Sequence, residues 1–345
     1  MRKTQVALAA LALVASTAAL ADGVTVSGSM DVGVGSFNTA TTPGTNTTGM
    51  QEGAFNGGSI VTISGTEDLG NGLKAGFTLQ SGFNAGTGAI SNGGNVPLAT
   101  YATTNQSVFN RQTNVSLSGD FGAVTAGLQF NQYINGQVST SLPGTPFGAF
   151  DVSAIIISGT TASSTLDGGG FFNRNSVSYV APGIGGFTAG IQRQVGTGTE
   201  GMSAGSLVGS VGDVKLGAGY LNRSGTEKAH TIGALVPMGE ISFNLRLTNY
   251  NPETGGDIKQ TRGGVSYALN SAVTLTAQHA KTSGLTGGTG KPTSLGAYYS
   301  MSKATGLYVH YSMASGATQG SAYGGASSTA AASGTNFGVG VVTNF

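Results

Sequence analysis

Short runs in which apolar and polar side chains alternate recur along nearly the whole chain. In one of them Ile241, Phe243, Leu245 and Leu247 hold the odd positions, and polar residues hold the positions between them. A period of two places the two sets on opposite faces of a β-strand. The pattern therefore predicts an all-β protein in which each strand has one apolar face and one polar face.

Sixteen runs of this kind follow one another between the two ends of the chain. The alternation is poorest in residues 204–210 and clean in most of the others. The predicted strands cover residues 23–37, 59–67, 73–83, 109–118, 123–130, 173–180, 187–195, 204–210, 214–221, 229–235, 240–249, 258–268, 273–279, 293–299, 306–313 and 335–345.

The connections between these strands are long and short in turn. Short ones such as 68–72 and 119–122 are rich in Gly, Asn and Asp, which suit tight turns. The long ones are 38–58, 84–108, 131–172, 196–203, 222–228, 250–257, 280–292 and 314–334. Outer-membrane barrels have short turns at one rim and long loops at the other. The sequence thus predicts a 16-stranded antiparallel transmembrane β-barrel, which is wide enough to leave an aqueous channel.

The composition favours a membrane barrel over a soluble domain. Only 8% of the residues are charged and 60 of 345 are Gly, whereas about a quarter of the residues of a soluble domain are charged. After the first 21 residues no segment reaches the ~18 consecutive apolar residues of a transmembrane helix. A closed barrel is the other structure that pairs all of its backbone groups within lipid.

Residues 1–21 have the features of a secretory signal. Arg2 and Lys3 form a basic start, residues 6–15 are apolar, and residues 19–21 read A-L-A, a small-residue cleavage site. We expect cleavage, which leaves residues 22–345 as one barrel domain. The remaining chain has 13 basic and 14 acidic residues. A net charge near −1 gives no reason to expect nucleic acid as a partner.

Several motifs resemble the general porins of the beta-proteobacterial type, a family of Gram-negative outer-membrane proteins. Residues 65–77 (GTEDLGNGLKAGF) resemble the second and third strands of these porins, and residues 111–122 (RQTNVSLSGDFG) match their next hairpin. Residues 175–190 (NSVSYVAPGIGGFTAG) match the hairpin after the third loop, and residues 298–309 (YYSMSKATGLYV) the penultimate one. Phe345 matches the family's terminal residue, which the outer-membrane assembly machinery recognises.

The resemblance implies a homotrimer in the outer membrane, in which each barrel is a passive diffusion channel for small hydrophilic solutes and ions. The third external loop folds into the lumen of such porins and narrows it, and here that loop would be 131–172. Residues 84–108 would be the latch onto the neighbouring subunit. The partners implied are outer-membrane lipid and the assembly machinery, with no cofactor and no enzymatic activity.

Selectivity in such a pore needs charged side chains at a wet constriction. Family porins set acidic loop residues against arginines of the wall. The loop candidates here are Asp151 and Asp167, and the wall candidates are Lys74, Arg111, Arg174, Arg246 and Arg262. Strand parity predicts an inward direction for all wall candidates except Arg111, which shares the parity of Val115 and is included through the resemblance alone. So few basic residues predict a weak preference for anions, and any one of these arginines is as well explained as a structural wall residue.

Other chemistry has little support in the sequence. His230, His279 and His310 lack the spacing of metal ligands. The GxGxxG run at 196–201 is expected by chance in a chain so rich in Gly, and no helix follows it. Serine is too frequent to single out a nucleophile. The alternatives to a general porin are a substrate-preferring channel on the same barrel, a glycine-rich surface adhesin or structural β protein, and an outer-membrane enzyme.

Overall fold

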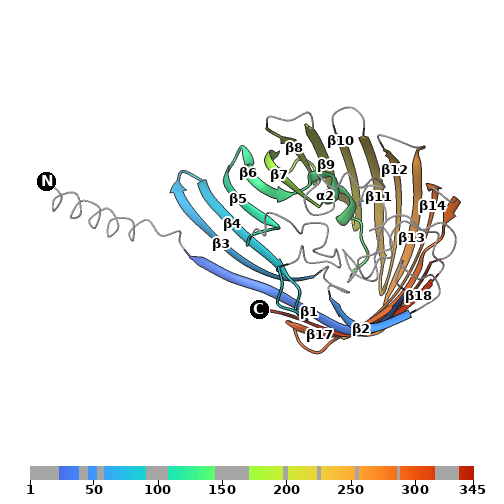
Figure 1. Ribbon diagram of the computed structural model, residues 1–345. Coiled ribbons are helices and arrows are strands. Elements are labelled where there is room, and N and C mark those ends of the chain that lie inside the picture. Colours follow the sequence, from blue (N-terminus) through green and yellow to red (C-terminus); the bar gives the residue numbers. More distant parts are fainter. Residues whose placement is uncertain are drawn as a thin grey trace, which may run out of the picture.

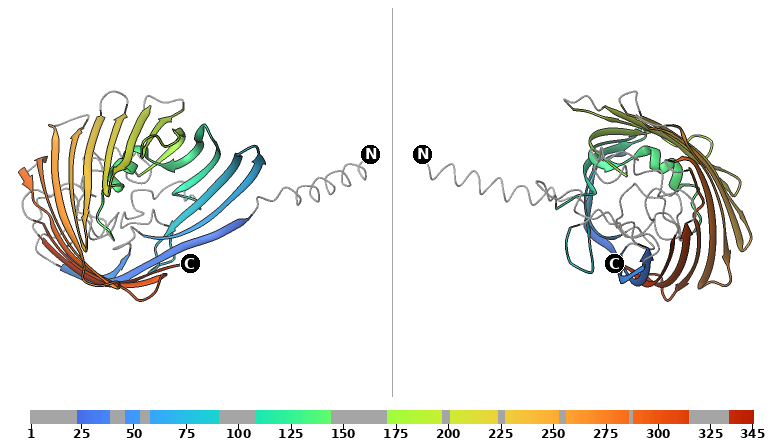
Figure 2. Two further views of the ribbon diagram at one scale, coloured as in Figure 1. Left: turned by 180° about the vertical axis from the view of Figure 1, so that it is seen from behind. Right: turned by 45° about the vertical axis from the view of Figure 1, so that its right-hand side comes forward.

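The computed structural model of the chain describes residues 23–38, 46–52, 58–90, 108–143, 171–196, 201–223, 227–252, 256–285, 288–314 and 334–345. These residues form one antiparallel sheet that curls into a ring (Figures 1 and 2). The predicted signal, residues 1–21, lies outside the described part. No helix of the described residues is both long and apolar enough to cross a membrane.

Among the described residues the sheet has eighteen named strands, and one short helix lies beside them. The elements are β1 (Val24–Asn38), β2 (Asn46–Glu52), β3 (Ser59–Gly70), β4 (Leu73–Phe83), β5 (Gln112–Gly119), β6 (Gly122–Phe130), α2 (Gln132–Val138), β7 (Phe172–Val180), β8 (Phe187–Gln194), β9 (Met202–Val211), β10 (Val214–Arg223), β11 (Glu227–Met238), β12 (Ile241–Asn251), β13 (Ile258–Ala268), β14 (Val273–Leu285), β15 (Gly288–Gly290), β16 (Thr293–Ser300), β17 (Thr305–Ala314) and β18 (Gly334–Asn344).

The eighteen strands occupy sixteen positions around the barrel, as the sequence predicts. Strands β2 and β3 pair with the two halves of β1, so they share one position. Strands β15 and β16 likewise share the edge of β14. All sixteen predicted runs are strands in the structure. The short β2 and β15 lie within connections that were predicted to be long loops, 38–58 and 280–292.

Pairing of β1 with β18 closes the ring. The ladder extends to Phe345, whose backbone N–H donates to the Gly28 carbonyl at 3.0 Å and whose carbonyl accepts from the Gly28 N–H at 2.9 Å. Closure leaves no free edge in the sheet, which a barrel in lipid requires.

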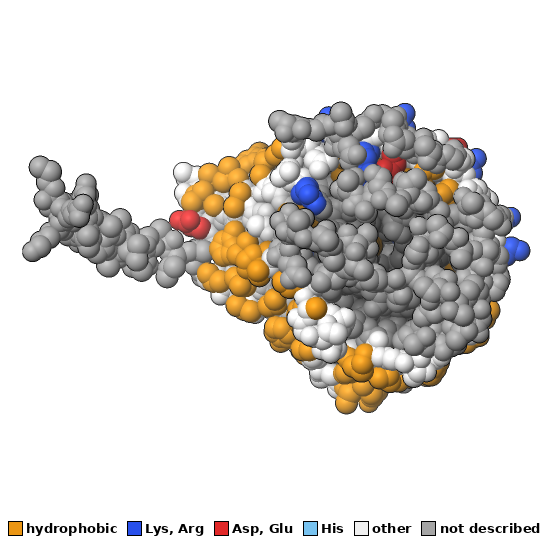
Figure 3. All heavy atoms as spheres, viewed as in Figure 1, with side chains coloured by type: hydrophobic (Ala, Val, Ile, Leu, Met, Phe, Trp, Pro, Cys, Tyr) orange, Lys and Arg blue, Asp and Glu red, His pale blue; other side chains and the backbone are white. Residues whose placement is uncertain are grey.

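The two faces of the sheet differ as the alternation predicts. Side chains such as Val26, Ile232 and Leu245 are exposed on the outer face, and Figure 3 shows part of this apolar surface in orange. Serine, threonine, asparagine and glutamine dominate the inner face. Lipid contact on one side and a polar lumen on the other explain how a chain with so few charges is accommodated.

Tight turns join the strands at one end of the barrel, which we call the short-turn rim; the other end is the long-loop rim. Between β3 and β4 the turn residues Asn71 and Gly72 have φ values of 53° and 77°. Such left-handed conformations suit Asn and Gly. Asn175 in β7 also has a positive φ, 49°, and a β-bulge interrupts the β6–β7 register there.

Candidate functional site

The first residues of the predicted third loop lie against the inner wall. Helix α2 contacts β9, β10 and β11, and in Figure 1 it lies inside the ring of strands. Its N-cap is Asn131, whose side-chain oxygen accepts from the Tyr133 N–H at 3.0 Å. Residues 131–143, the first part of the predicted loop 131–172, thus lie against the inner wall, whereas residues 144–170 lie outside the described residues. The insertion of the whole loop into the lumen stays a prediction.

Glycines allow the helix to approach the wall closely. A Cβ atom at Gly219 would lie 2.5 Å from the Tyr133 carbonyl oxygen, and one at Gly217 would collide with the Gly136 carbonyl. A Cβ at Gly136 itself would collide with the backbone of Ala218. Backbone therefore meets backbone where α2 crosses β10, which only glycine permits.

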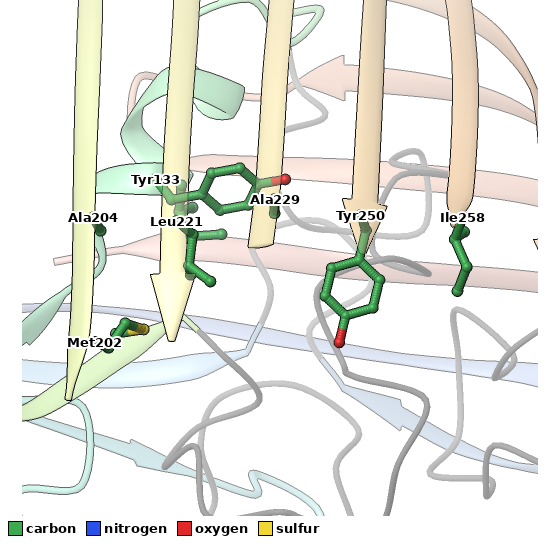
Figure 4. Close-up of a cluster of buried hydrophobic side chains, with 8 residues drawn as sticks. Tyr133, Met202, Ala204, Leu221, Ala229, Tyr250 and Ile258 are labelled. Carbon is green, nitrogen blue, oxygen red and sulfur yellow. The ribbon is translucent and has the colours of Figure 1, made fainter. Parts of the chain in front are cut away.

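An apolar cluster on the inner face receives the side chains of α2 (Figure 4). Tyr133 and Ile134 are buried there among residues of β9 to β13. The wall contributes Met202, Ala204, Leu221, Ala229, Tyr250 and Ile258. This patch departs from the polar rule of the lumen, because it serves as the packing surface for the helix.

Two arginines of the wall face each other beside this helix. Arg246 of β12 pairs in register with Arg262 of β13, and their side chains are 2% and 0% exposed. The Arg246 Nη1 donates to the Gln137 carbonyl at 2.8 Å. The Arg262 Nε donates to Oε1 of Gln278 at 2.9 Å, and its Nη2 donates to the same oxygen. The inward direction predicted for both residues is confirmed.

Beyond the helix, the chain stays attached to the wall. Asn244 of β12 donates from Nδ2 to the Thr140 carbonyl at 3.1 Å. Leu142 lies so close to Gly264 of β13 that a Cβ atom there would approach the leucine methyl to 2.8 Å. Residues 132–142 thus cross the wall from β9 toward β13 and pass Arg246 on the way. The arginine pair lies where the wall and the inserted segment meet.

Arg111 reaches the inner face despite its parity. Strand β5 begins only at Gln112, so the alternation does not govern Arg111. Its Nε donates to Oε1 of Gln80 at 3.0 Å, and Gln80 in turn donates to Thr62 at 2.9 Å, both on the inward parity. The guanidinium also lies 4.8 Å from the Phe172 ring centroid. Burial lowers the pKa of Arg111 to about 10, so it is charged at neutral pH.

A β-bulge interrupts the strand alternation beside Arg174. The bulge at Asn175 shifts the register, so that Asn173, and not Arg174, lies opposite Gln129 of β6. Asn173 is buried and donates to Gln192 at 2.7 Å, whereas Arg174 is exposed. Asn173 thus occupies the inward position that a regular strand would give to Arg174, and the inward direction of Arg174 stays a prediction.

The remaining predicted residues lie apart from the arginine pair. Lys74 is exposed near the short-turn rim and pairs in register with Asp68. Asp151 and Asp167 fall outside the described residues. Phe345 is exposed on the outer face at the end of the β18 ladder.

Sequence reasoning missed two inward polar clusters. Arg223 forms an ion pair with Glu227 at 3.3 Å, and the Tyr250 hydroxyl donates to Glu227 at 2.5 Å. Arg223 and Glu227 lie beyond the ends of the predicted strands, where the alternation predicts no direction. The Tyr308 hydroxyl donates to Asp31 at 2.7 Å. Because Asp31 lies on the polar parity of a predicted strand, its inward direction could have been predicted from the sequence.

Metal chemistry has no support within the described residues, where no three His, Cys, Asp or Glu side chains converge. Of the three histidines, only His310 is buried, and it lies beside the Tyr308 ring with 6.3 Å between centroids. His230 and His279 are exposed.

Comparison with known proteins gives consistent matches. A family model described as Gram-negative porin matches residues 7–319. Outer membrane porin protein 32 of Delftia acidovorans is 32% identical over 297 residues, which are 79% of this chain and 76% of that protein. An outer membrane porin of Bordetella pertussis is 34% identical over 205 residues, but these are only 47% of its length. The solved anion-selective porin from Comamonas acidovorans has a TM-score of 0.70 at 25% identity and covers 94% of this chain and 99% of its own.

Proposed function

This chain belongs to the Gram-negative porin family, and from that premise we propose a homotrimer of passive channels with a weak preference for anions. Membership places the protein in the outer membrane and makes it a porin for small hydrophilic solutes and ions. Members of this family are channels and not enzymes. The observation that carries the proposed preference is the pair of Arg246 and Arg262 on the lumen side of the wall.

Two adjacent positive charges in the wall raise the electrostatic potential of the nearby water path. Exposed charges are screened over about 8 Å at physiological ionic strength, whereas buried ones are screened less. Arg246 and Arg262 are both buried, so water and salt screen their electric field less than that of exposed charges. This field lowers the electrostatic energy of an anion that passes the inserted segment, and it raises the energy of a cation. No conformational step is needed for permeation.

Other charged residues complete the proposed constriction. Arg111 contributes a third positive charge near β4 and β5. Asp151 and Asp167 of the loop oppose the wall in this proposal, as the resemblance implies. Two loop acids against few basic residues leave a small net bias, so we propose a modest selectivity. Lys74 and Arg174, at the rims, contribute little to it.

Reversal potentials in a planar bilayer under a salt gradient test the preference for anions. We expect Arg246→Gln combined with Arg262→Gln to lower the ratio of anion to cation permeability severalfold, because two positive charges leave the lumen wall. Replacing both arginines with lysine keeps the charge and should keep the ratio. Lys303→Gln, at an exposed turn, is the matched control for loss of a distant charge. An unchanged ratio in the double glutamine variant contradicts the proposal.

One observation bears on the alternative of a substrate-preferring channel. Tyr298 and Tyr308 face each other in register on the inner face of β16 and β17, with His310 beside them. A binding track needs rings that a solute can touch, but Tyr308 and His310 are 3% and 1% exposed. The aromatic group is therefore packing in the wall, and general diffusion remains the better proposal.

The outer wall offers a surface for the proposed trimer. An apolar depression of about 640 Å³ spans β1, β2, β14 and β16 to β18, and includes Val34, Leu307 and Val339. Because the chain has no cysteine, single cysteines can be placed without background. We expect Val34→Cys to cross-link neighbouring subunits, and Ile232→Cys on the distant β11 to serve as the exposed control. Equal cross-linking of the two variants contradicts this assignment of the interface. Residues 91–107 of the proposed latch, 84–108, lie outside the described residues.

A further inference from the structure

Exposed lysines gather on the outer face at the long-loop rim. They lie on the strand parity that carries exposed apolar side chains such as Ile232 and Leu295 nearer the middle of the wall. The members of this lysine patch are Lys228 on β11, Lys259 on β13, Lys281 on β14 and Lys291 just before β16. In a chain with only 15 basic residues, four on one side of one rim is a marked concentration.

The strand register brings two of these lysines face to face. Thr282 of β14 pairs with Gly290, so the next antiparallel pair is Lys281 with Lys291. Lys259 lies diagonal to Lys281, because its own partner on β14 is Ser283. Like charges directly opposite each other destabilise a sheet. Such a placement is understandable where an anion from outside the chain offsets the repulsion.

Carboxylates of the described residues do not neutralise the patch. Among the described residues, Asp257 is an acid close to Lys259, and its Oδ1 accepts from the Asn251 side chain at 2.6 Å. The ion pair described in this region, between Arg223 and Glu227, lies on the inner face. Within the ranges that the structure describes, the four lysines form no ion pair.

A groove of about 360 Å³ opens beside the patch on β11 to β13. Ile232 and Leu247 supply apolar side chains from the outer face, and His230, Asn249 and Lys259 supply polar ones. The groove therefore joins the apolar belt to the positive rim. An amphiphile with an acyl chain and a negative head group has the matching arrangement.

We propose that the lysine patch binds the phosphate groups of phosphorylated lipids in the leaflet around the long-loop rim. Basic residues at a membrane surface attract anionic lipid head groups. The acyl chains would lie on the apolar belt below, where such a lipid already has to pack. The inference needs the protein to span the outer membrane, but it is independent of conductance and ion preference.

Lipid binding by the refolded full chain tests this site. Neutral detergent micelles with the protein are titrated with bisphosphorylated lipid A, and bound lipid is counted by native mass spectrometry. Lys281→Gln with Lys291→Gln should weaken binding on the order of tenfold or more. Lys215→Gln with Lys303→Gln removes the same charge at the short-turn rim and should leave binding unchanged. Equal weakening in both double variants, or none in either, would overturn the proposal.

Two further readouts separate the site from its alternatives. Stability in neutral micelles should be equal or higher for Lys281→Gln with Lys291→Gln, because the repulsion is relieved; a loss of stability would assign the lysines a structural role. Inorganic phosphate at millimolar concentration should not displace the lipid, and displacement would indicate a free-anion site. Bilayer conductance should be the same in both double variants, so failure of the channel proposal and failure of this one are distinguishable.

Discussion

The amide side chain of Gln278 accepts two hydrogen bonds from Arg262. Gln278 accepts from both Nε and Nη2 of this guanidinium, which fixes the plane of the group against the wall. A buried charge without its hydrogen-bond partner is costly. The position of positive charge in this lumen therefore depends on a neutral residue of the neighbouring strand.

Replacing Gln278 with leucine tests that dependence. We expect the free energy of unfolding to fall by about 2–4 kcal/mol, because an acceptor to a buried charged donor is lost. Urea titration followed by gel mobility measures the change. Gln278→Glu keeps an acceptor and should cost less, and Gln278→Leu with Arg262→Met should recover part of the loss. Additive losses in the double variant would show that the two side chains do not depend on each other.

Asn175 tests the backbone at the bulge. Its φ of 49° is strained for a β-branched residue and free for glycine. Asn175→Val should destabilise the barrel by about 1–2 kcal/mol, whereas Asn175→Gly should be nearly neutral. Equal unfolding midpoints for the two variants would contradict a structural requirement for the left-handed conformation.

At the scale of elements, alternation predicted strands well and insertions poorly. The sixteen runs depend on a repeated local pattern, and even the weak run 204–210 is part of β9 (Met202–Val211). Strands β2 and β15 are short and polar or glycine-rich, so they show no apolar face. Helix α2 is seven residues long and contains Gly136, and its stability comes from packing on the wall, which no local pattern reveals.

Parity does not fix the direction of a side chain where the strand itself is irregular. Arg111 precedes the first paired residue of β5, and Arg174 precedes a bulge. In both places the sequence continues to alternate, but the backbone does not continue as a regular paired strand. Arg246 and Arg262 lie in the middle of regular strands, and there the predicted direction is confirmed.

The contact of α2 with β10 leads to a test at this scale. Gly136→Ala places a methyl group against the Ala218 backbone, so we expect α2 to be displaced and single-channel conductance to change by a measurable fraction. Gly256→Ala is the control, because nothing lies within 4 Å of a Cβ there. Identical conductance in both variants would mean that α2 does not limit the pore.

At the scale of the whole molecule, the ring is held shut by its two most distant strands. Gly28 and Phe345 exchange both backbone hydrogen bonds at this seam. A Cβ at Gly28 would collide with the Ile60 carbonyl and approach the Phe345 ring to 2.6 Å. The seam therefore requires a residue without a side chain at position 28, beside the ring of Phe345.

Gly28→Val should lower the yield of folded barrel severalfold, because the side chain obstructs the β1–β18 pairing. Gly23→Val, which has open space around its Cβ, is the control. The fraction with folded mobility on a semi-native gel after refolding measures the effect. Similar yields from the two variants would show that the seam tolerates the obstruction.

Because β1 and β18 are the first and last strands of the described sheet, the seam cannot form until every strand between them is present and aligned. A chain with a missing or misaligned strand keeps two unpaired edges, and such edges can pair with other chains. Closure thus distinguishes complete from incomplete barrels. A closed barrel has no free strand edge, whereas a barrel that lacks a strand still exposes two edges.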